Sequence, residues 1–375
     1  MKIILCFDDI DNQGMEIIVD WLKEICADKS TNNVSPLRYS LFSVNDHYPK
    51  EPRTVPQLYE QVLRHCGMAE DLGYDTFFCA EHHFHEYGVV PDPAVMLSAL
   101  AQRTKRIRLG TAISILTFHD PRQIAETYSM VDMMSGGRLV FGVGSGYLKH
   151  EFIGYDANPA EKRDLFNENL DIVKRLMSGE TLSYTGKFSK SEKVAINVLP
   201  HEGRLPPIHV AVLARDGMFH VGKSGNFIFT VPYACCKDFA DIGNLLVDFR
   251  RGRAEVGLQP DDNDHIVTLH TYVARTDEEA KAHCKAAYDQ YVETRLYAAK
   301  HVYEDIMKNG ICLFGSVETV TQKVCQLYEM GVRHVATLHN FGGLQPKLVE
   351  RSMALFANEV MPAVAARFGP TALAA

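Results

Sequence analysis

Short apolar runs alternate along the chain with longer segments whose apolar residues share one stripe. The alternation begins at Tyr39 and continues toward the end of the sequence. The run at 76–79 is short and apolar, which is typical of a buried strand. The segment 55–72 has helical spacing instead, and Gly73 follows it as a C-terminal cap. Its apolar stripe consists of Leu58, Val62, Cys66 and Ala69.

The same pattern predicts further strands and helices in alternation. Strands are predicted at 39–44, 75–79, 107–115, 138–143, 207–212, 226–230, 265–274 and 332–338. Helices are predicted at 55–72, 93–103, 121–135, 160–177 and 344–361. Seven or eight strand–helix units in succession favour a parallel sheet. This number favours an α/β fold of the closed (β/α)8 TIM barrel type over an open doubly wound sheet.

Three regions depart from the alternation. Residues 1–38 are predicted to form an N-terminal extension, a short strand and helix followed by a polar linker, and 39–375 the barrel domain. Residues 180–206 have the character of a hairpin insertion. The segment 285–315 is predicted to be helical and aromatic-rich, with 292–314 as a lid over the barrel mouth.

Composition limits the class of protein. The chain of 375 residues is 46% hydrophobic, with no apolar run long enough to span a membrane, so we expect a soluble protein with a large core. The net charge of -8 has no basic stripe, which argues against nucleic acid or an anionic membrane as a partner. The nine cysteines are scattered and the opening apolar run is too short for a signal peptide, so we expect reduced thiols and a cytoplasmic location.

Polar residues accompany two neighbouring predicted strands. The segment Ala80-Glu81-His82-His83-Phe84 follows the strand at 76–79, and Gly110-Thr111-Ala112 lies within the strand at 107–115. Ligands of parallel α/β proteins bind at the carboxyl ends of the strands. We therefore expect both segments to face one mouth, which indicates an enzyme.

The imidazoles of this region allow three interpretations. His82, His83 and His85 with Glu81 and Glu86 have metal-ligand chemistry, but adjacent histidines on a turn point in different directions, so no metal site is predicted. A general base or proton carrier is favoured, because imidazole titrates near neutral pH. Histidines satisfied by neighbouring loops, with no chemical role, are the third interpretation.

Two loops after predicted strands suit a ligand with a phosphate group. The turn at 142–147 fails the dinucleotide fingerprint because Tyr147 stands where glycine is needed, yet its alternating glycines would let backbone approach a flat ligand. A tight barrel turn explains it equally well. The loop at 213–217 begins a helix, and its free amides with Arg215 suit a phosphate, whereas a surface Arg-Asp turn is the alternative.

Taken together, these motifs resemble the bacterial luciferase-like family of flavin-dependent monooxygenases. The resemblance runs from Tyr39 to Pro362. The matching segments are 81–84, 110–112, 119–121 with 123–126, 132–138, 141–147 with 151–152, 315–319 and 342–343. Each is short, whereas their order and spacing together are specific.

The resemblance implies a (β/α)8 barrel that holds reduced FMN at the carboxyl ends of the strands. It puts His82 beside the flavin as the catalytic residue, where it assists proton handling at the C4a-hydroperoxide. Ala112 matches positions that bring backbone against the isoalloxazine ring, often through a non-proline cis peptide. The other residues implied to bind the cofactor are Glu81, Thr111, Gly144, Ser145, Tyr147, Ala211 and Ala214.

One position departs from the family pattern. Ser145 stands where family members commonly have an arginine that pairs with the FMN phosphate, and the Ser, Thr or Glu residues usual near Ala214 are also missing. We hypothesise that Arg215 with the amides of the following helix start replaces them.

The resemblance implies a two-component monooxygenase that inserts one oxygen atom from O2 into a small organic substrate. Because the chain has no NAD fingerprint, a separate NAD(P)H-dependent flavin reductase is the expected partner. The helices at 93–103 and 121–135 are expected to form a homodimer face. The alternatives are a deazaflavin-dependent hydride-transfer enzyme of the same superfamily, a non-catalytic flavin-binding subunit and, third, a metal-dependent barrel hydrolase.

Overall fold

The computed structural model describes residues 36–294 and 301–369. The predicted extension at 1–38 lies outside these residues except for its last three. The expected barrel begins with β1 at Arg38. Among the described helices, none is both long and apolar enough to cross a membrane. All seven cysteines of the described part are free thiols.

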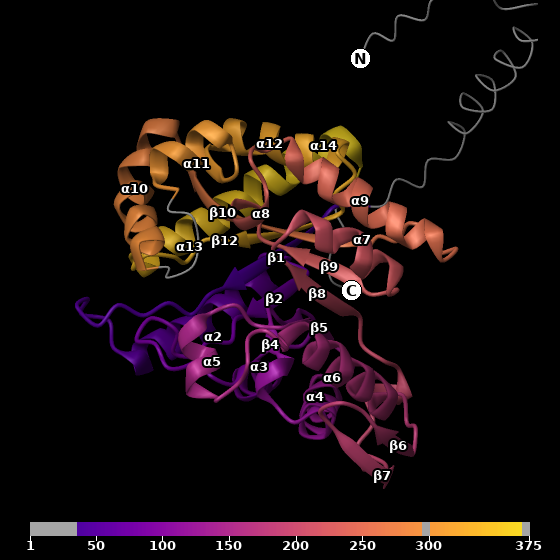
Figure 1. The fold of residues 1–375 in the computed structure, drawn as a ribbon. Helices are drawn as coiled ribbons and strands as arrows, with labels where there is room; N and C mark the ends of the chain where they lie inside the picture. Colours follow the sequence, from indigo (N-terminus) through magenta and orange to yellow (C-terminus); the bar gives the residue numbers. More distant parts are fainter. Residues whose placement is uncertain (1–35, 295–300, 370–375) are drawn as a thin grey trace, which may run out of the picture. The chain divides into compact units, whose positions relative to one another are not determined.

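Eight parallel strand positions of the described chain close into a barrel (Figure 1). The closed order is β1, β2, β3, β5, β8, β9, β10 and β12, with β12 pairing back to β1. The bounds are β1 (Arg38–Ser43), β2 (Thr76–Cys79), β3 (Arg108–Thr111), β4 (Ser114–Ile115), β5 (Leu139–Gly144), β8 (Ile208–Val212), β9 (Phe227–Thr230), β10 (His265–Ala274) and β12 (His334–Leu338). The predicted TIM barrel is confirmed.

Helices follow the strands and cover the barrel, as the apolar stripes predicted. They are α2 (Val55–Asp71), α3 (Pro93–Arg103), α4 (Pro121–Ser135), α5 (Lys149–Gly154), α6 (Lys162–Met177), α7 (Arg215–Lys223), α8 (Pro232–Cys235), α9 (Asp241–Glu255), α10 (Asp277–Thr294), α11 (Tyr303–Asn309), α12 (Val317–Glu329), α13 (Pro346–Leu355) and α14 (Met361–Phe368). The Thr54 side chain caps α2 by accepting a hydrogen bond from the Gln57 amide. In return, the Gln57 side chain accepts a hydrogen bond from the Thr54 amide. Gly136, at φ 72°, ends α4 where a left-handed residue is required.

The strand predicted at 107–115 is interrupted. It consists of β3 and the two-residue β4, with the peptide bond between Ala112 and Ile113 in the cis form. Both parts still pair with β5. The interruption therefore lies inside the barrel wall, at the carboxyl end of β3.

Two predictions outside the barrel have different outcomes. The hairpin is confirmed, because β6 (Leu182–Thr185) and β7 (Lys190–Val194) pair antiparallel in a sheet of their own. The continuous helical segment at 285–315 is wrong. Gly310 ends α11 at φ 74°. The chain then forms β11 (Leu313–Ser316), which pairs with β10 and buries Leu313 and Phe314 fully. The predicted lid at 292–314 includes 295–300, which lie outside the described residues.

The terminal helix is longer than predicted. The sequence pattern ended it at residue 361, whereas α13 continues through a π-helical turn, Phe356–Val360, into α14, which ends at Phe368. Buried Val360 and Val364 extend the apolar stripe past Pro362. Proline is tolerated there because it occupies the first turn of α14.

The register of the strands brings their carboxyl ends together. Cys79 at the end of β2 is level with Thr111 at the end of β3, and Val143 near the end of β5 is level with Val210 in β8. The loops that follow these strands therefore share one rim of the barrel. The two sequence segments expected to face one mouth leave from this rim.

Candidate active site

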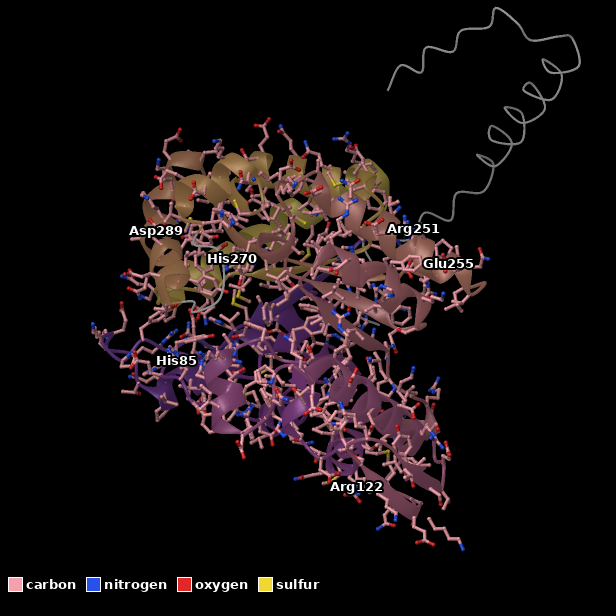
Figure 2. All side chains as sticks on the ribbon, viewed as in Figure 1. His85, Arg122, Arg251, Glu255, His270 and Asp289 are labelled. Carbon is pink, nitrogen blue, oxygen red and sulfur yellow. The ribbon has the colours of Figure 1, made fainter. Side chains whose placement is uncertain are left out.

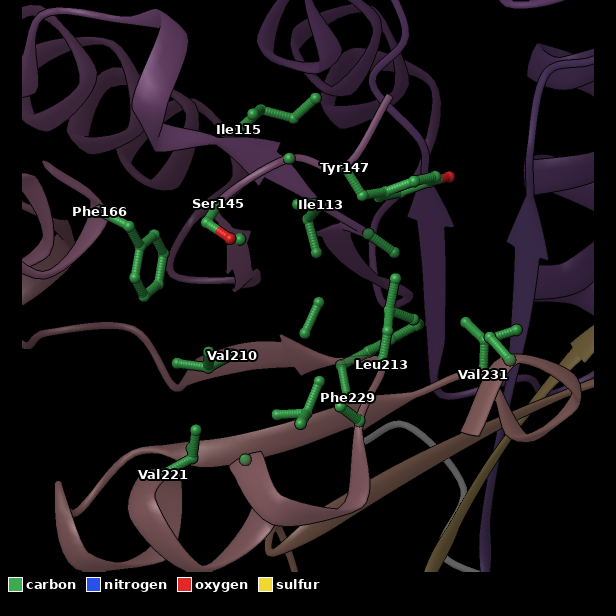
Figure 3. A pocket seen from close by; sticks show the side chains of 18 of the residues that line it. Ile113, Ile115, Ser145, Tyr147, Phe166, Val210, Leu213, Val221, Phe229 and Val231 are labelled. Atoms are coloured by element: carbon green, nitrogen blue, oxygen red, sulfur yellow. The ribbon is translucent and has the colours of Figure 1, made fainter. Parts of the chain in front are cut away.

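A cavity of about 740 Å³ lies at the carboxyl ends of the strands. Its wall comes from the loops after β2, β3, β5 and β8, from β9, and from α6 and α7. Figure 3 shows Ser145 and Tyr147 on one side of it and Val221 of α7 on the other. Its volume is within the range of small-molecule and cofactor sites.

Most residues expected to bind a cofactor line this cavity. They are Glu81, His82, Ala112, Gly144, Ser145, Tyr147, Ala211 and Ala214. Thr111 and Arg215 do not line it. The Thr111 hydroxyl donates a hydrogen bond to the Gly142 carbonyl at 2.6 Å, so this side chain ties β3 to β5. A Cβ at residue 142 would lie 2.0 Å from the Thr111 carbonyl oxygen, which explains the glycine.

Small residues and backbone form one part of the wall. The Ala112 amide donates to the Cys79 carbonyl at 2.9 Å, which holds the cis Ala112–Ile113 segment against the end of β2. Across from it, a Cβ on Gly144 would lie 2.2 Å from Ile113 Cδ1 and 3.6 Å from Ala211 Cβ. A side chain at residue 144 would therefore displace Ile113, so the glycine lets Ile113 pack against the end of β5.

His82 is paired with a buried carboxylate from α5, the short helix after β5. Its Nδ1 lies 3.3 Å from Glu151 Oε1, and the same oxygen accepts a hydrogen bond from the His83 amide at 3.0 Å. The Glu151 side chain is buried. A carboxylate on Nδ1 fixes the tautomer of a histidine and stabilises its imidazolium form. Glu151 was part of a matched motif but was not among the predicted site residues.

His83 points to a different carboxylate. Its Nε2 lies 2.8 Å from Glu81 Oε1, and the Nε2 of His119 lies 2.8 Å from the same oxygen. Glu81 Oε2 accepts from the Ile115 amide at 3.1 Å. The adjacent imidazoles thus diverge as expected. The ring of His85, which is labelled in Figure 2, packs against that of Tyr87 with centroids 4.6 Å apart.

The electrostatics of this second cluster favour a charged pair. Burial raises the pKa of the Glu81 carboxyl, but hydrogen bonds from His119 and His83 outweigh it and leave the pKa below its ordinary value. Burial lowers the pKa of His119, yet Glu81 outweighs it and the pKa is raised. The ligand atoms of Glu81, His83 and His119 lie within 4.8 Å of one another, which is also compatible with metal ligation.

Cationic side chains reach the cavity from α6. Lys162, Arg163 and Lys174 line it. Lys162 Nζ donates to the Gly146 carbonyl at 3.1 Å, and Lys174 Nζ to Asn226 Oδ1 at 3.2 Å. These residues were missed because charges on an amphipathic helix normally belong to its solvated face.

Arg215 has a different surrounding from the one hypothesised. Its Nε donates to Asp248 Oδ2 of α9 at 2.8 Å, and its guanidinium lies 3.8 Å from Asp241. Ala214 and Asp216 on either side line the cavity, whereas Arg215 does not. To reach a phosphate in the cavity, Arg215 would have to leave Asp248.

The chain is similar to known enzymes over most of its length. It is 29% identical to the oxygenase component of a flavin-dependent trigonelline monooxygenase from Acinetobacter baylyi, over 65% of this chain and 67% of that protein. It is 24% identical to an F420-dependent glucose-6-phosphate dehydrogenase from Intrasporangium calvum, over 80% and 94%.

Solved structures have the same fold. The monooxygenase RslO1 from Streptomyces bottropensis superposes with a TM-score of 0.81 at 25% identity, over 87% of this chain and 99% of that one. The oxygenating constituent of 3,6-diketocamphane monooxygenase from Pseudomonas putida, in complex with FMN, superposes with a TM-score of 0.75 at 20% identity, over 87% and 98%. The second likeness shows the fold alone.

A family model supplies the assignment. The model described as luciferase-like monooxygenase matches residues 38–334, which is most of the chain and nearly the whole barrel. The resemblance inferred from the motifs is thereby confirmed. The chain belongs to the luciferase-like monooxygenase family and is an enzyme of the flavin-dependent monooxygenase class.

Proposed function

We propose that the protein binds reduced FMN in the cavity and uses O2 to insert one oxygen atom into a small organic substrate. The observation that carries the proposal is the cavity itself, at the carboxyl ends of the strands, with Glu81 and His82 in a wall that is otherwise mainly apolar. The names of the trigonelline monooxygenase and of the FMN-bound monooxygenase structure support this cofactor class.

The residues of the cavity fit a flavin. Ala112, Gly144 and Ala211 give the cavity a wall of small residues on which a planar ring can lie, and Phe229 provides an apolar surface in the same cavity. When bound, reduced FMN supplies the electrons that activate O2. Such oxygen chemistry requires that bulk water be kept from the reacting atoms, and the apolar residues Ile113, Leu213 and Phe229 of the wall favour this.

His82 is proposed as the residue that holds or donates a proton at the flavin. Its Nδ1 faces Glu151, so the proton that it exchanges with the cavity resides on Nε2. Glu151 orients the ring and stabilises the charged imidazole during that exchange. A general acid–base role requires a fixed ring orientation, and the hydrogen bond to buried Glu151 provides it.

The phosphate of FMN is proposed to lie near Arg163. This exposed arginine lines the cavity at the start of α6, and no described carboxylate is within salt-bridge distance of it. Arg215 instead bonds Asp248. Arginine binds a phosphate with two parallel hydrogen bonds. Arg163 would therefore pair with the FMN phosphate in place of the arginine that is missing at Ser145.

The expected partners follow from the same proposal. A separate NAD(P)H-dependent reductase supplies the reduced flavin, as the words "oxygenase component" suggest for the trigonelline relative. A second copy of the chain is proposed to cover exposed apolar side chains on α3 and α4, which pack together. These are Val95, Met130, Met133 and Met134, with exposed fractions of 43–69%. The cytoplasmic location stays a prediction.

The experiment is anaerobic mixing of the purified protein with FMNH2, followed by O2, while flavin absorbance and oxygen consumption are recorded. We expect the protein to change the reoxidation rate relative to free FMNH2. Reoxidation identical to that of free flavin would contradict the proposal. The F420-dependent relative makes deazaflavin hydride transfer the second candidate, and turnover with reduced F420 in place of FMNH2 would establish it. If His82→Ala left turnover unchanged, the role proposed for His82 would be wrong, whereas flavin binding without any turnover in the wild type would favour a non-catalytic flavin-binding role.

A further inference from the structure

Four side chains form one hydrogen-bonded series beside the cavity. The Tyr155 hydroxyl lies 3.1 Å from His83 Nδ1, and His83 Nε2 lies 2.8 Å from Glu81 Oε1. His119 Nε2 approaches the same oxygen at 2.8 Å. With both Nε2 atoms donating, the Tyr155 O–H donates to His83 Nδ1. Both ring nitrogens of His83 are then engaged within the series.

The two ends of this series face different surroundings. Glu81 lines the cavity, and its side chain is only 1% exposed. The His119 side chain does not line the cavity and is 27% exposed. His83 is 4% exposed and Tyr155 packs on Phe118 with ring centroids 4.8 Å apart. Of the two imidazoles bonded to Glu81, His119 is therefore the one open to solvent.

We propose that Glu81 and His119 form a proton-exchange pair between the cavity and solvent, with His83 and Tyr155 as positioning residues. The proposal rests on the function proposed above. The proton on His119 Nε2 moves to Glu81 Oε1, which leaves a neutral imidazole and a carboxylic acid. The acid gives its proton to the group in the cavity that needs it, and water returns a proton to His119. The reverse order removes a proton from the cavity.

The charges around the pair are consistent with one stored proton. The raised pKa of His119 and the lowered pKa of Glu81 favour that proton on His119 over Glu81. Asp92, before α3, raises the pKa of His119 further. Other titratable groups that face the pair are His83, Cys79 of β2, Tyr128 of α4 and Tyr155.

The distances favour a shared proton over a metal ion. Both nitrogens lie 2.8 Å from a single oxygen, which is hydrogen-bond length. In a tetrahedral zinc site with metal–donor distances of about 2.0–2.1 Å, two donor atoms lie about 3.3 Å from each other. Glu81 Oε2 is also already bonded to the Ile115 amide. Metal binding is therefore an outcome of the test.

The first measurement needs no flavin. Histidine ring nitrogens are labelled with ¹⁵N, and the pKa of His119 is measured by NMR in ligand-free wild type, Glu81→Gln and Glu81→Asp. The proposal predicts a His119 pKa above about 6.5 in wild type and in Glu81→Asp, and a lower one in Glu81→Gln. An equal His119 pKa in wild type and Glu81→Gln would overturn it. Stoichiometric uptake of Co²⁺ by wild type, lost in His119→Gln, would overturn it in favour of a metal site.

The second measurement is turnover with FMNH2 and O2 across pH. His119→Gln keeps the donor to Glu81 but carries no exchangeable charge, so turnover falls about 10-fold or more and added imidazole restores part of it. The matched control is His201→Gln, because His201 lies beside Gly137 at the opposite end of β5. An unchanged rate and pH profile in His119→Gln would overturn the pair. If wild type has no flavin turnover, the proposed function fails, and the NMR result decides the pair by itself.

Discussion

Glu151 Oε1 lies 3.3 Å from His82 Nδ1 and also accepts a hydrogen bond from the His83 amide at 3.0 Å, so one buried oxygen holds the His82 ring and the backbone of the next residue. Glu151→Gln keeps an acceptor at this place but removes the negative charge. We therefore expect turnover to fall about 10-fold or more, which is part of the roughly 10²–10⁴-fold acceleration that general acid–base catalysis contributes as a whole. Steady-state oxygen consumption with a thermal melt measures the effect. A large fall in melting temperature, with turnover retained at low temperature, would assign Glu151 to stability alone.

The phosphate proposal is decided by a pair of arginine variants. Arg163→Gln should weaken FMN binding by about 10- to 100-fold, because an arginine–phosphate pair contributes about 1.5–3 kcal/mol. Arg215→Gln, at a residue already bonded to Asp248, should leave affinity nearly unchanged. Fluorescence titration with FMN measures both, and riboflavin, which has no phosphate, is the control ligand. The reverse result would restore the original hypothesis for Arg215.

The dimer face makes a prediction about mass in solution. Met130→Asp with Met133→Asp puts charges on the exposed apolar side of α4, so a dimer formed through α3 and α4 should dissociate. Val247→Asp on α9, where the wild-type side chain is 66% exposed, is the matched control and should leave the mass unchanged. Light scattering during size exclusion reads the mass. Dissociation by the α9 variant alone would place the interface elsewhere.

Acid should destabilise the protein through histidines buried in their neutral form. Burial lowers the pKa of His65, His209, His265 and His339 to about 3. Because the unfolded chain binds these protons near pH 6.5, the stabilising contribution is complete above that pH and is lost as pH falls toward 3. Each group contributes a slope of up to about 1.4 kcal/mol per pH unit in this window.

Urea unfolding between pH 5 and 8 tests this. The histidine contribution to the free energy of unfolding should be constant above pH 7. It should decrease as the pH falls below 6.5. His265→Gln, whose wild-type ring bonds Thr230 Oγ1, should reduce the acid slope by one group. A slope unchanged in this variant would mean that His265 titrates normally.

Local patterns in the sequence predicted the barrel well. The strands predicted at 75–79 and 265–274 carry their signal in their own residues, and the structure has them at Thr76–Cys79 and His265–Ala274. The interruption at Ala112 was implied by the resemblance to a family, because no periodicity encodes it. The helical prediction for 285–315 was wrong at β11, since pairing with β10 depends on a neighbour about 40 residues earlier.

The site was predicted in its parts and not in its pairings. His82 and Glu151 are 69 residues apart, and Glu81 and His119 are 38 apart, so only the folded barrel determines which imidazole meets which carboxylate. Arg215 illustrates the reverse case. Its position at a helix start suited a phosphate, but the Arg215 guanidinium is hydrogen-bonded to Asp248 of α9.

A crystal structure of the protein soaked anaerobically with FMNH2 tests the central claim most directly. We predict the flavin ring in the cavity beside Ala112 and Gly144, with His82 within reach of its reacting edge and the phosphate near Arg163. Flavin bound at another surface, with this cavity empty at saturating ligand, would contradict the account.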